Sequence, residues 1–235
     1  MQKIGFSNFL LILALAALPL GGCAEAWKDF SKSFTPDGQE QNIKESDIAA
    51  LTNFDTAAGS GNELNAANLY IEKLSKEVIT VLTDTSKSQD QRIKFFGGLL
   101  ARDLNIPLIA RFTVGNHWRS AKPEERKAYV TIFSDYIIQT YSSRLGGAKV
   151  EKFDIVNTQA VGKRDILVRT RVRNSGSNPI RADWRLRANE GQFQIIDLSV
   201  EGISMALMLR KEFASVLRQK GGINGLIQIL KQRTA

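Results

Sequence analysis

Between residues 149 and 200 the sequence alternates between apolar and polar side chains in four successive segments, and this pattern is the strongest constraint on the fold. A period of two is typical of strands that bury one face. The predicted strands are Lys149–Asn157, Arg164–Asn174, Pro179–Ala188 and Gln192–Val200, with turns at Gly162, Ser175-Gly176 and Asn189-Glu190-Gly191. Because turns this short join antiparallel neighbours, the sequence predicts a four-stranded antiparallel meander.

The second and third predicted strands have two very different faces. One face carries Ile166, Val168, Thr170, Val172, Ile180, Ala182, Trp184 and Leu186. The other carries Arg169, Arg171, Arg173, Arg181, Asp183, Arg185 and Arg187. We call the second face the arginine face. A solvated surface is its simplest use, but it holds more arginine than solubility requires, so a docking role stays open.

Helical periodicity surrounds this segment on both sides. About six helices are predicted, near residues 66–84, 88–104 and 107–116, from Pro123 to a stop at Gly146-Gly147, and over 204–219 and 223–231. In the long helix, Pro123 and the two glutamates after it suit a first helical turn. The expected fold class is therefore α+β, with helices covering one face of the sheet.

The N-terminus indicates export. Lys3 precedes an unbroken apolar run of 12 residues, Phe9–Leu20. This run is shorter than the ~20 residues that span a bilayer, but it suits a signal peptide. Residues 1–26 would be removed at Ala24-Glu25-Ala26, or residues 1–22 at a lipobox-like Leu20-Gly21-Gly22-Cys23 that leaves Cys23 lipidated. Both alternatives predict a periplasmic protein of the Gram-negative type.

After the leader, residues 27–65 are predicted to be a flexible segment, because they contain Thr35-Pro36-Asp37-Gly38 and a run of small residues. Residues 66–235 form the predicted folded domain. Cys23 is the only cysteine, so this domain holds no intramolecular disulfide. The chain has a formal net charge of +8, which for an exported protein favours anionic headgroups or acidic proteins over nucleic acid.

The sequence offers little for catalysis. His117 is the only histidine, and no G-x-S-x-G motif is present. A structural zinc site needs about four Cys or His ligands, and no glycine-rich phosphate loop occurs. We therefore expect a protein that is not an enzyme, with no metal and no cofactor, and a structural role for His117.

Motifs in the second half of the chain carry a resemblance to a known family. They are Asp103-Leu104-Asn105-Ile106, Ala110-Arg111, Val114-Gly115, Trp118-Arg119, Pro123-Glu124-Glu125-Arg126, Thr140-Tyr141-Ser142-Ser143-Arg144-Leu145, Ile195-Ile196-Asp197-Leu198, Glu201-Gly202-Ile203-Ser204, Arg210 through Phe213 and Gly221-Gly222-Ile223-Asn224-Gly225-Leu226. In order and spacing they resemble the MlaC family, also called toluene-tolerance proteins, over roughly residues 93–233. Ala121-Lys122 departs from the pattern, since Thr or Ser often precedes the proline.

The resemblance implies a periplasmic carrier that binds a phospholipid by its acyl tails, in an apolar cavity between a curved sheet and the helices. Such proteins shuttle lipid between inner and outer membranes and support outer-membrane lipid asymmetry. Their implied partners are an inner-membrane ABC transporter complex with a lipid-binding ring protein, and an outer-membrane lipoprotein complex. Two alternatives stay open: a hopanoid or other polycyclic lipid as cargo, and a ligand-free scaffold that works through its arginine face.

Under this hypothesis, nine residues are predicted to line the cavity: Phe133, Tyr136, Ile155, Val168, Val172, Trp184, Leu186, Met205 and Met208. Val168→Trp is expected to fill the cavity and leave the protein folded. At the mouth, Ser204 and Arg210 are candidates for hydrogen bonds to a headgroup phosphate. The alternative for Arg210 is an internal ion pair with Asp197 or Glu201, which we favour.

Overall fold

The computed structural model describes residues 61–145, 150–174, 178–189 and 192–234. The predicted signal peptide, Cys23, the two loops at 175–177 and 190–191 and the Gly146-Gly147 stop lie outside these ranges, as does the predicted flexible segment up to residue 60. The described helices are α4 (Gly61–Thr83), α5 (Gln89–Asp103), α6 (Ile106–Val114), α7 (His117–Ser120), α8 (Pro123–Leu145), α9 (Met205–Gln219) and α10 (Ile223–Thr234). The strands are β1 (Val150–Val161), β2 (Asp165–Asn174), β3 (Ile180–Asn189), β4 (Gln192–Val200) and β5 (Ile203–Ser204).

The sheet is an antiparallel meander with strand order β1-β2-β3-β4-β5, so the predicted α+β class and strand order are confirmed. Two details differ from the prediction. The strand β1 continues to Val161 past a bulge between Ile155 and Asn157. The two-residue strand β5 follows a tight turn at Glu201 and Gly202, whose φ values of 50° and 81° are both positive, as hairpin turns of type I′ require.

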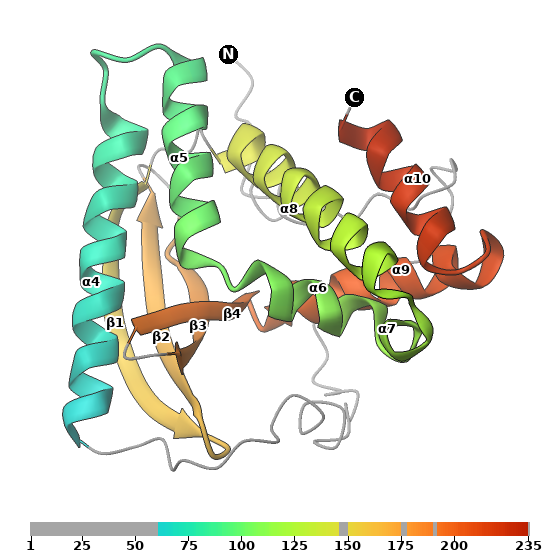
Figure 1. The fold of residues 1–235 in the computed structure, drawn as a ribbon. Coiled ribbons are helices and arrows are strands. Elements are labelled where there is room, and N and C mark those ends of the chain that lie inside the picture. The colour runs from blue at the N-terminus through green and yellow to red at the C-terminus, as the bar shows by residue number, and fades with distance from the viewer. Residues whose placement is uncertain (1–60, 146–149, 175–177, 190–191, 235) are drawn as a thin grey trace.

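Helices α4 and α5 cover the apolar face of the sheet (Figure 1). Ile71, Leu74 and Val78 lie on one side of α4, because positions 3, 4 and 7 residues apart share a helix face. They pack with Val168, Val172 and Leu186 of the sheet in what we call the sheet core. Tyr70 Oη also donates to Asp103 Oδ1 at 2.9 Å and so joins α4 to α5.

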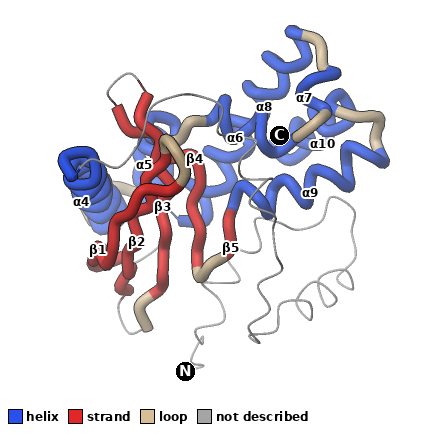
Figure 2. The backbone as a smooth tube through the Cα atoms, turned by 90° about the horizontal axis from the view of Figure 1, so that it is seen from below, coloured by secondary structure: helices blue, strands red, loops and turns tan. Residues whose placement is uncertain are grey.

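The remaining long helices form a second core of their own. Tyr129, Phe133 and Tyr136 of α8 pack with Phe213 of α9 and with Leu226 and Leu230 of α10 in what we call the helical core. In Figure 2, α8, α9 and α10 are grouped beyond the β4–β5 edge of the sheet. The sequence predicted helices over one face; instead they divide into two groups, because the apolar side chains of α8 meet other helices. None of the described helices is both long and apolar enough to cross a membrane.

Candidate functional site

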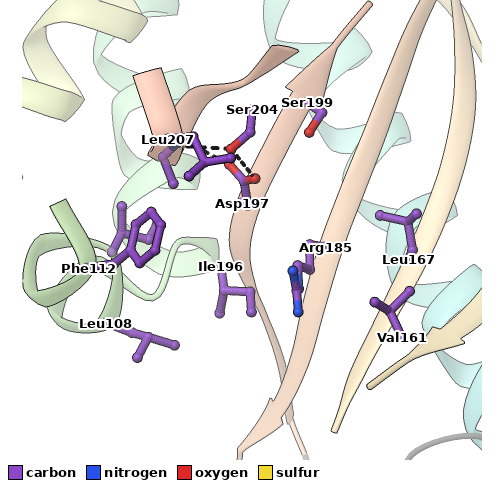
Figure 3. Close-up of a pocket in the computed structure, with 12 residues that line it drawn as sticks. Leu108, Phe112, Val161, Leu167, Arg185, Ile196, Asp197, Ser199, Ser204 and Leu207 are labelled. Atoms are coloured by element: carbon purple, nitrogen blue, oxygen red, sulfur yellow. Dashed lines mark hydrogen bonds between the residues drawn. The ribbon is translucent and has the colours of Figure 1, made fainter. Parts of the chain in front are cut away.

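A pocket of about 180 Å³ lies where the arginine face meets α6 and the beginning of α9 (Figure 3). Eight of its residues are apolar: Leu108, Ile109, Phe112, Val161, Leu167, Ile196, Ala206 and Leu207. The other four are Arg185, Asp197, Ser199 and Ser204. Several apolar lining side chains are only half-buried, among them Leu108, Leu167 and Leu207, so the pocket opens to the surface. It is an apolar site with a polar border.

The floor of the pocket follows from the register of the sheet. Leu167 of β2 pairs with Arg185 of β3, and Arg185 pairs with Asp197 of β4. Directly paired residues of antiparallel strands share a face. Leu167 is therefore an apolar residue among the arginines, and it supplies the floor with a surface that the neighbouring positions lack.

Helix α6 is fixed against β4 by polar contacts at its beginning. Leu104 forms a bridge with Ile195, and Asn105 N–H donates to the Ile195 carbonyl at 2.9 Å. The Asn105 side chain caps the helix by accepting from Leu108 N–H at 3.0 Å, and its Nδ2 donates to Gln194 Oε1 at 2.7 Å. These bonds place Leu108 and Phe112 over Ile196, which lies at the irregularity in the β3–β4 pairing.

The upper border of the pocket is a carboxylate that holds the beginning of α9. Asp197 accepts hydrogen bonds from Ser204 Oγ at 2.5 Å, Ala206 N–H at 3.0 Å and Leu198 N–H at 2.9 Å. Ser204 in turn caps α9 by accepting from Leu207 N–H at 3.1 Å. Burial raises the pKa of Asp197, and these hydrogen bonds and the nearby Arg185 only partly offset that effect.

Arg185 is held at the pocket by a buried ion cluster. Its Nη2 lies 2.7 Å from Asp165 Oδ2, and Arg187 Nε lies 2.7 Å from Asp165 Oδ1. Asp165 is fully buried, and a buried carboxylate needs such partners. This pairing leaves Arg185 as an oriented cation on the border of an apolar pocket.

The structure does not bring the nine predicted cavity residues together. Ile155, Val168, Val172, Trp184 and Leu186 belong to the sheet core, on the opposite face from the pocket. Val168 and Leu186 have no exposed surface there. Trp184 Nε1 donates to Thr170 Oγ1 at 3.0 Å, and its ring lies 6.2 Å from that of Phe153.

The other four predicted residues lie on helices. Phe133 and Tyr136 are in the helical core, with ring centroids 6.2 and 6.4 Å from Phe213. Met205 packs against Ile180 and Val200, in a small cluster at the end of the sheet. Met208 is half-buried on α9.

Of the two predicted mouth residues, Ser204 lines the pocket and Arg210 does not. The Arg210 guanidinium lies 4.9 Å above the ring of Phe112. The ion pair that we favoured for Arg210 is absent among the described residues. Asp197 contacts Ser204 instead, and Glu201 accepts from the Arg181 N–H. Phe112 offers Arg210 a cation–π contact that the sequence does not reveal.

Sequence reasoning missed most of the pocket: Leu108, Ile109, Phe112, Val161, Leu167, Arg185, Ile196, Ser199, Ala206 and Leu207 as site residues. One signal was visible. Leu167 is apolar at a position where the alternation of β2 calls for a polar residue, and an apolar side chain on a polar face needs its own cover.

The polar residues that line the pocket are an arginine, an aspartate and two serines. Ser204 contacts Asp197, but no histidine lines the pocket to act as the base of a hydrolytic triad. Within the described ranges, no group of three or more His, Cys, Asp or Glu side chains is placed to hold a metal ion. What the geometry offers is apolar contact with a polar border.

Comparison with known proteins finds relatives of this chain. One relative is the intermembrane phospholipid transport system binding protein MlaC of Haemophilus influenzae, which is 24% identical over 133 residues. That match spans 55% of this chain and 62% of the relative. A solved structure, the phospholipid-binding protein of Ralstonia solanacearum in complex with a phospholipid, shares the fold, with a TM-score of 0.64 at 20% identity. The structural match covers 72% of this chain and 96% of the Ralstonia solanacearum chain.

The family model described as MlaC protein matches residues 72–232, which extends from α4 to α10 and includes the whole pocket. The chain belongs to the MlaC family.

Proposed function

We propose that this protein binds a phospholipid, with acyl-chain methylenes in the pocket on the arginine face and the headgroup at the border formed by Arg185 and Ser199. The observation that carries the proposal is an apolar, surface-open pocket whose edge holds a cation, the Ser199 hydroxyl and an Asp197 carboxyl that is hydrogen-bonded to Ser204. A phospholipid has this same division into apolar tails and an anionic group. Membership of the MlaC family and the phospholipid-related functions of the two relatives support the assignment.

Energetics explain why such a carrier is needed. Burying a methylene is worth about 0.8 kcal/mol. Two acyl chains with about 30 methylenes would therefore cost on the order of 20 kcal/mol to expose to water. A protein pocket of similar polarity to the membrane interior removes most of this cost, so loading runs close to thermoneutral and requires no covalent step.

The pocket has to widen to take complete tails. Its 180 Å³ is below the ~300–1,000 Å³ that sites for drug-sized ligands occupy. The sheet floor is fixed by its hydrogen-bonded ladder, whereas α6 and α9 close the pocket through side chains. Widening therefore means that Leu108, Phe112 and Leu207 move away from Leu167 and Ile196.

A second candidate position for the tails is the one predicted from the sequence, in the layer between the sheet and the helices α4 and α5. Because Val168 and Leu186 are completely buried there, lipid would enter by displacing α4 from the sheet. Phe133 and Tyr136 would not share that cavity, because they lie in the helical core. The two positions make opposite predictions for neighbouring residues of β2.

The proposed setting is the periplasm. There the protein would shuttle lipid between the inner and outer membranes, with an inner-membrane ABC transporter complex and its lipid-binding ring protein at one end and an outer-membrane lipoprotein complex at the other. This setting rests on the export signal and on the transport system named for the Haemophilus influenzae relative. Lipidation of Cys23 would turn a free carrier into a tethered one.

The test is to express the chain from Trp27, purify it without detergent, extract it with organic solvent and analyse the extract by mass spectrometry. Stoichiometric two-tailed phospholipid is the expected result. If the extract contains a polycyclic lipid instead, that lipid and not phospholipid is the cargo. An empty extract from folded protein would refute lipid carriage and favour the ligand-free scaffold.

A further inference from the structure

The arginine face carries a second feature, at the far end from the Arg185 ion cluster. We call it the basic patch: Lys152, Arg169, Arg171, Arg173 and Arg181, together with Asp154 and Asp183. Lys152, Arg173 and Arg181 are more than half exposed, at 63%, 57% and 54% of the side chain. Five bases and two acids leave a net charge of +3, or +2 when Glu201 in the adjacent turn is included.

The register of the sheet sets like charges against each other within this patch. Arg171 of β2 is the direct partner of Arg181 of β3, and Lys152 of β1 is the direct partner of Arg173 of β2. Like charges in directly opposed positions destabilise a sheet. The acids relieve this only in part: Asp154 lies 2.6 Å from Lys152 and 2.7 Å from Arg173, and Asp183 lies 3.5 Å from Arg181.

Two repulsive pairs on one exposed surface favour an anionic partner that would neutralise them. The paired same-face positions of β1 to β3 in the patch carry no aromatic side chain, and the exposed apolar residue beside them, Val156, is the small one at the bulge of β1. Stable protein–protein interfaces place aromatic anchors at their centre and exclude charge from it. An array of cations without such an anchor suits a partner that is bound by charge alone, as an anionic bilayer surface is.

We propose that the basic patch docks this protein on anionic phospholipid bilayers with the arginine face toward the membrane. Leu167, in the floor of the pocket, and Arg169 and Arg171, in the patch, are successive same-face residues of β2. Two residues along a strand span about 6.7 Å. Docking through the patch therefore brings the open pocket to the surface from which lipid would be taken. This orientation rests on the proposed function, but binding to the bilayer can be measured without any cargo.

The test is flotation of the mature chain with vesicles of phosphatidylcholine, alone or mixed with phosphatidylglycerol, at low and at physiological ionic strength. The expected result is binding to the anionic vesicles that weakens as the Debye length falls to about 8 Å. The variant is Arg171→Gln with Arg181→Gln. Because each arginine near such a surface contributes about 1 kcal/mol and 1.4 kcal/mol is tenfold, the partition coefficient should fall about thirtyfold.

The matched control is Lys73→Gln with Lys76→Gln. It removes the same charge from exposed positions of α4, the helix that covers the opposite face of the sheet. It should bind almost as well as the wild type. Equal losses in the two variants, or no preference for anionic vesicles, would overturn the proposal, and the latter would point to an acidic protein instead. The patch variant should stay folded, because the lost Arg171–Arg181 repulsion and the lost Arg181–Asp183 ion pair act in opposite directions. If the protein does not bind vesicles but still co-purifies with lipid, the docking proposal fails while lipid carriage stands.

Discussion

Replacing Leu167 with tryptophan is the sharpest test of where the lipid lies, because the next residue, Val168, points to the opposite face of the same strand. Leu167 lies in the floor of the pocket, and Val168 is fully buried in the sheet core. The pocket's 180 Å³ is room for about six groups of the ~30 Å³ size of a water molecule, and a methylene is similar. At about 0.8 kcal/mol each, excluding six methylenes costs up to about 5 kcal/mol.

That loss corresponds to more than a thousandfold weaker lipid binding. We therefore expect Leu167→Trp to be purified with little lipid and with a melting temperature close to that of the wild type, because the half-buried side chain has open space beside it. Val168→Trp should instead keep its lipid and lose about 1–3 kcal/mol of stability by overpacking. For a chain of this size that is a drop of about 2–4 °C per kcal/mol.

The assay is quantitative mass spectrometry of lipid per mole of protein, combined with thermal unfolding of both variants. The reverse result would refute the pocket on the arginine face. Folded Val168→Trp without lipid, beside a fully loaded Leu167→Trp, would place the tails between the sheet and α4, as the sequence predicted.

Two further predictions concern the border of the pocket and the packing of the two helix groups. Because burial raises the pKa of Asp197, the fold favours its protonated form. The stability advantage of the wild type over Asp197→Asn should then be largest below the usual Asp pKa of about 3.9, and it should shrink as the pH rises through the raised pKa. Denaturant titrations across that pH range measure this difference. An advantage that stays constant or grows with pH would contradict the prediction. For the helix groups, a Cβ at Gly97 would lie 3.7 Å from Ser142 Cβ, within the ~3.5–4.5 Å range of disulfides. Gly97→Cys with Ser142→Cys should oxidise and stabilise the fold by about 2–4 kcal/mol, less any strain from Ile138 Cγ2 at 3.1 Å; equal unfolding curves with and without reductant would contradict the α5–α8 contact.

The strands could be predicted well because their pattern reports a local property, the alternation of buried and exposed side chains. Four strands and their order were found from it, and Gln192–Val200 even has the observed bounds. The end of β1, after Asn157, was missed because Thr158 and Gln159 are polar. They pair with β2 nevertheless, since Thr158 faces Asn68 of α4 and Gln159 accepts from Arg169.

The pocket could not be predicted in the same way. Periodicity shows which residues of one strand share a face, but not which distant helix lies over that face. Leu108 and Leu207 are 99 positions apart in the sequence, and they meet only because the Asn105 cap and the Asp197 carboxylate hold α6 and α9 against β4. The aromatic residues of α8 looked equally suited to a cavity wall, yet they are buried in contacts with α9 and α10.

The two faces of the sheet also differ in what they can offer an amphipathic ligand. The layer under α4 is closed and mostly apolar, and its polar groups bond to one another, as Trp184 Nε1 does to Thr170 Oγ1. A phosphate entering it would lose its hydration without a free partner, at a cost of several kcal/mol. On the arginine face, Leu167 stands two residues from Arg169 and directly beside Arg185. The tails can therefore find apolar contact, and the headgroup a cation, within a few ångströms of each other along one strand. If that is the reason for the arginines, then changing Arg185 should alter headgroup preference while leaving the number of bound tails unchanged, whereas changing Leu167 should do the opposite.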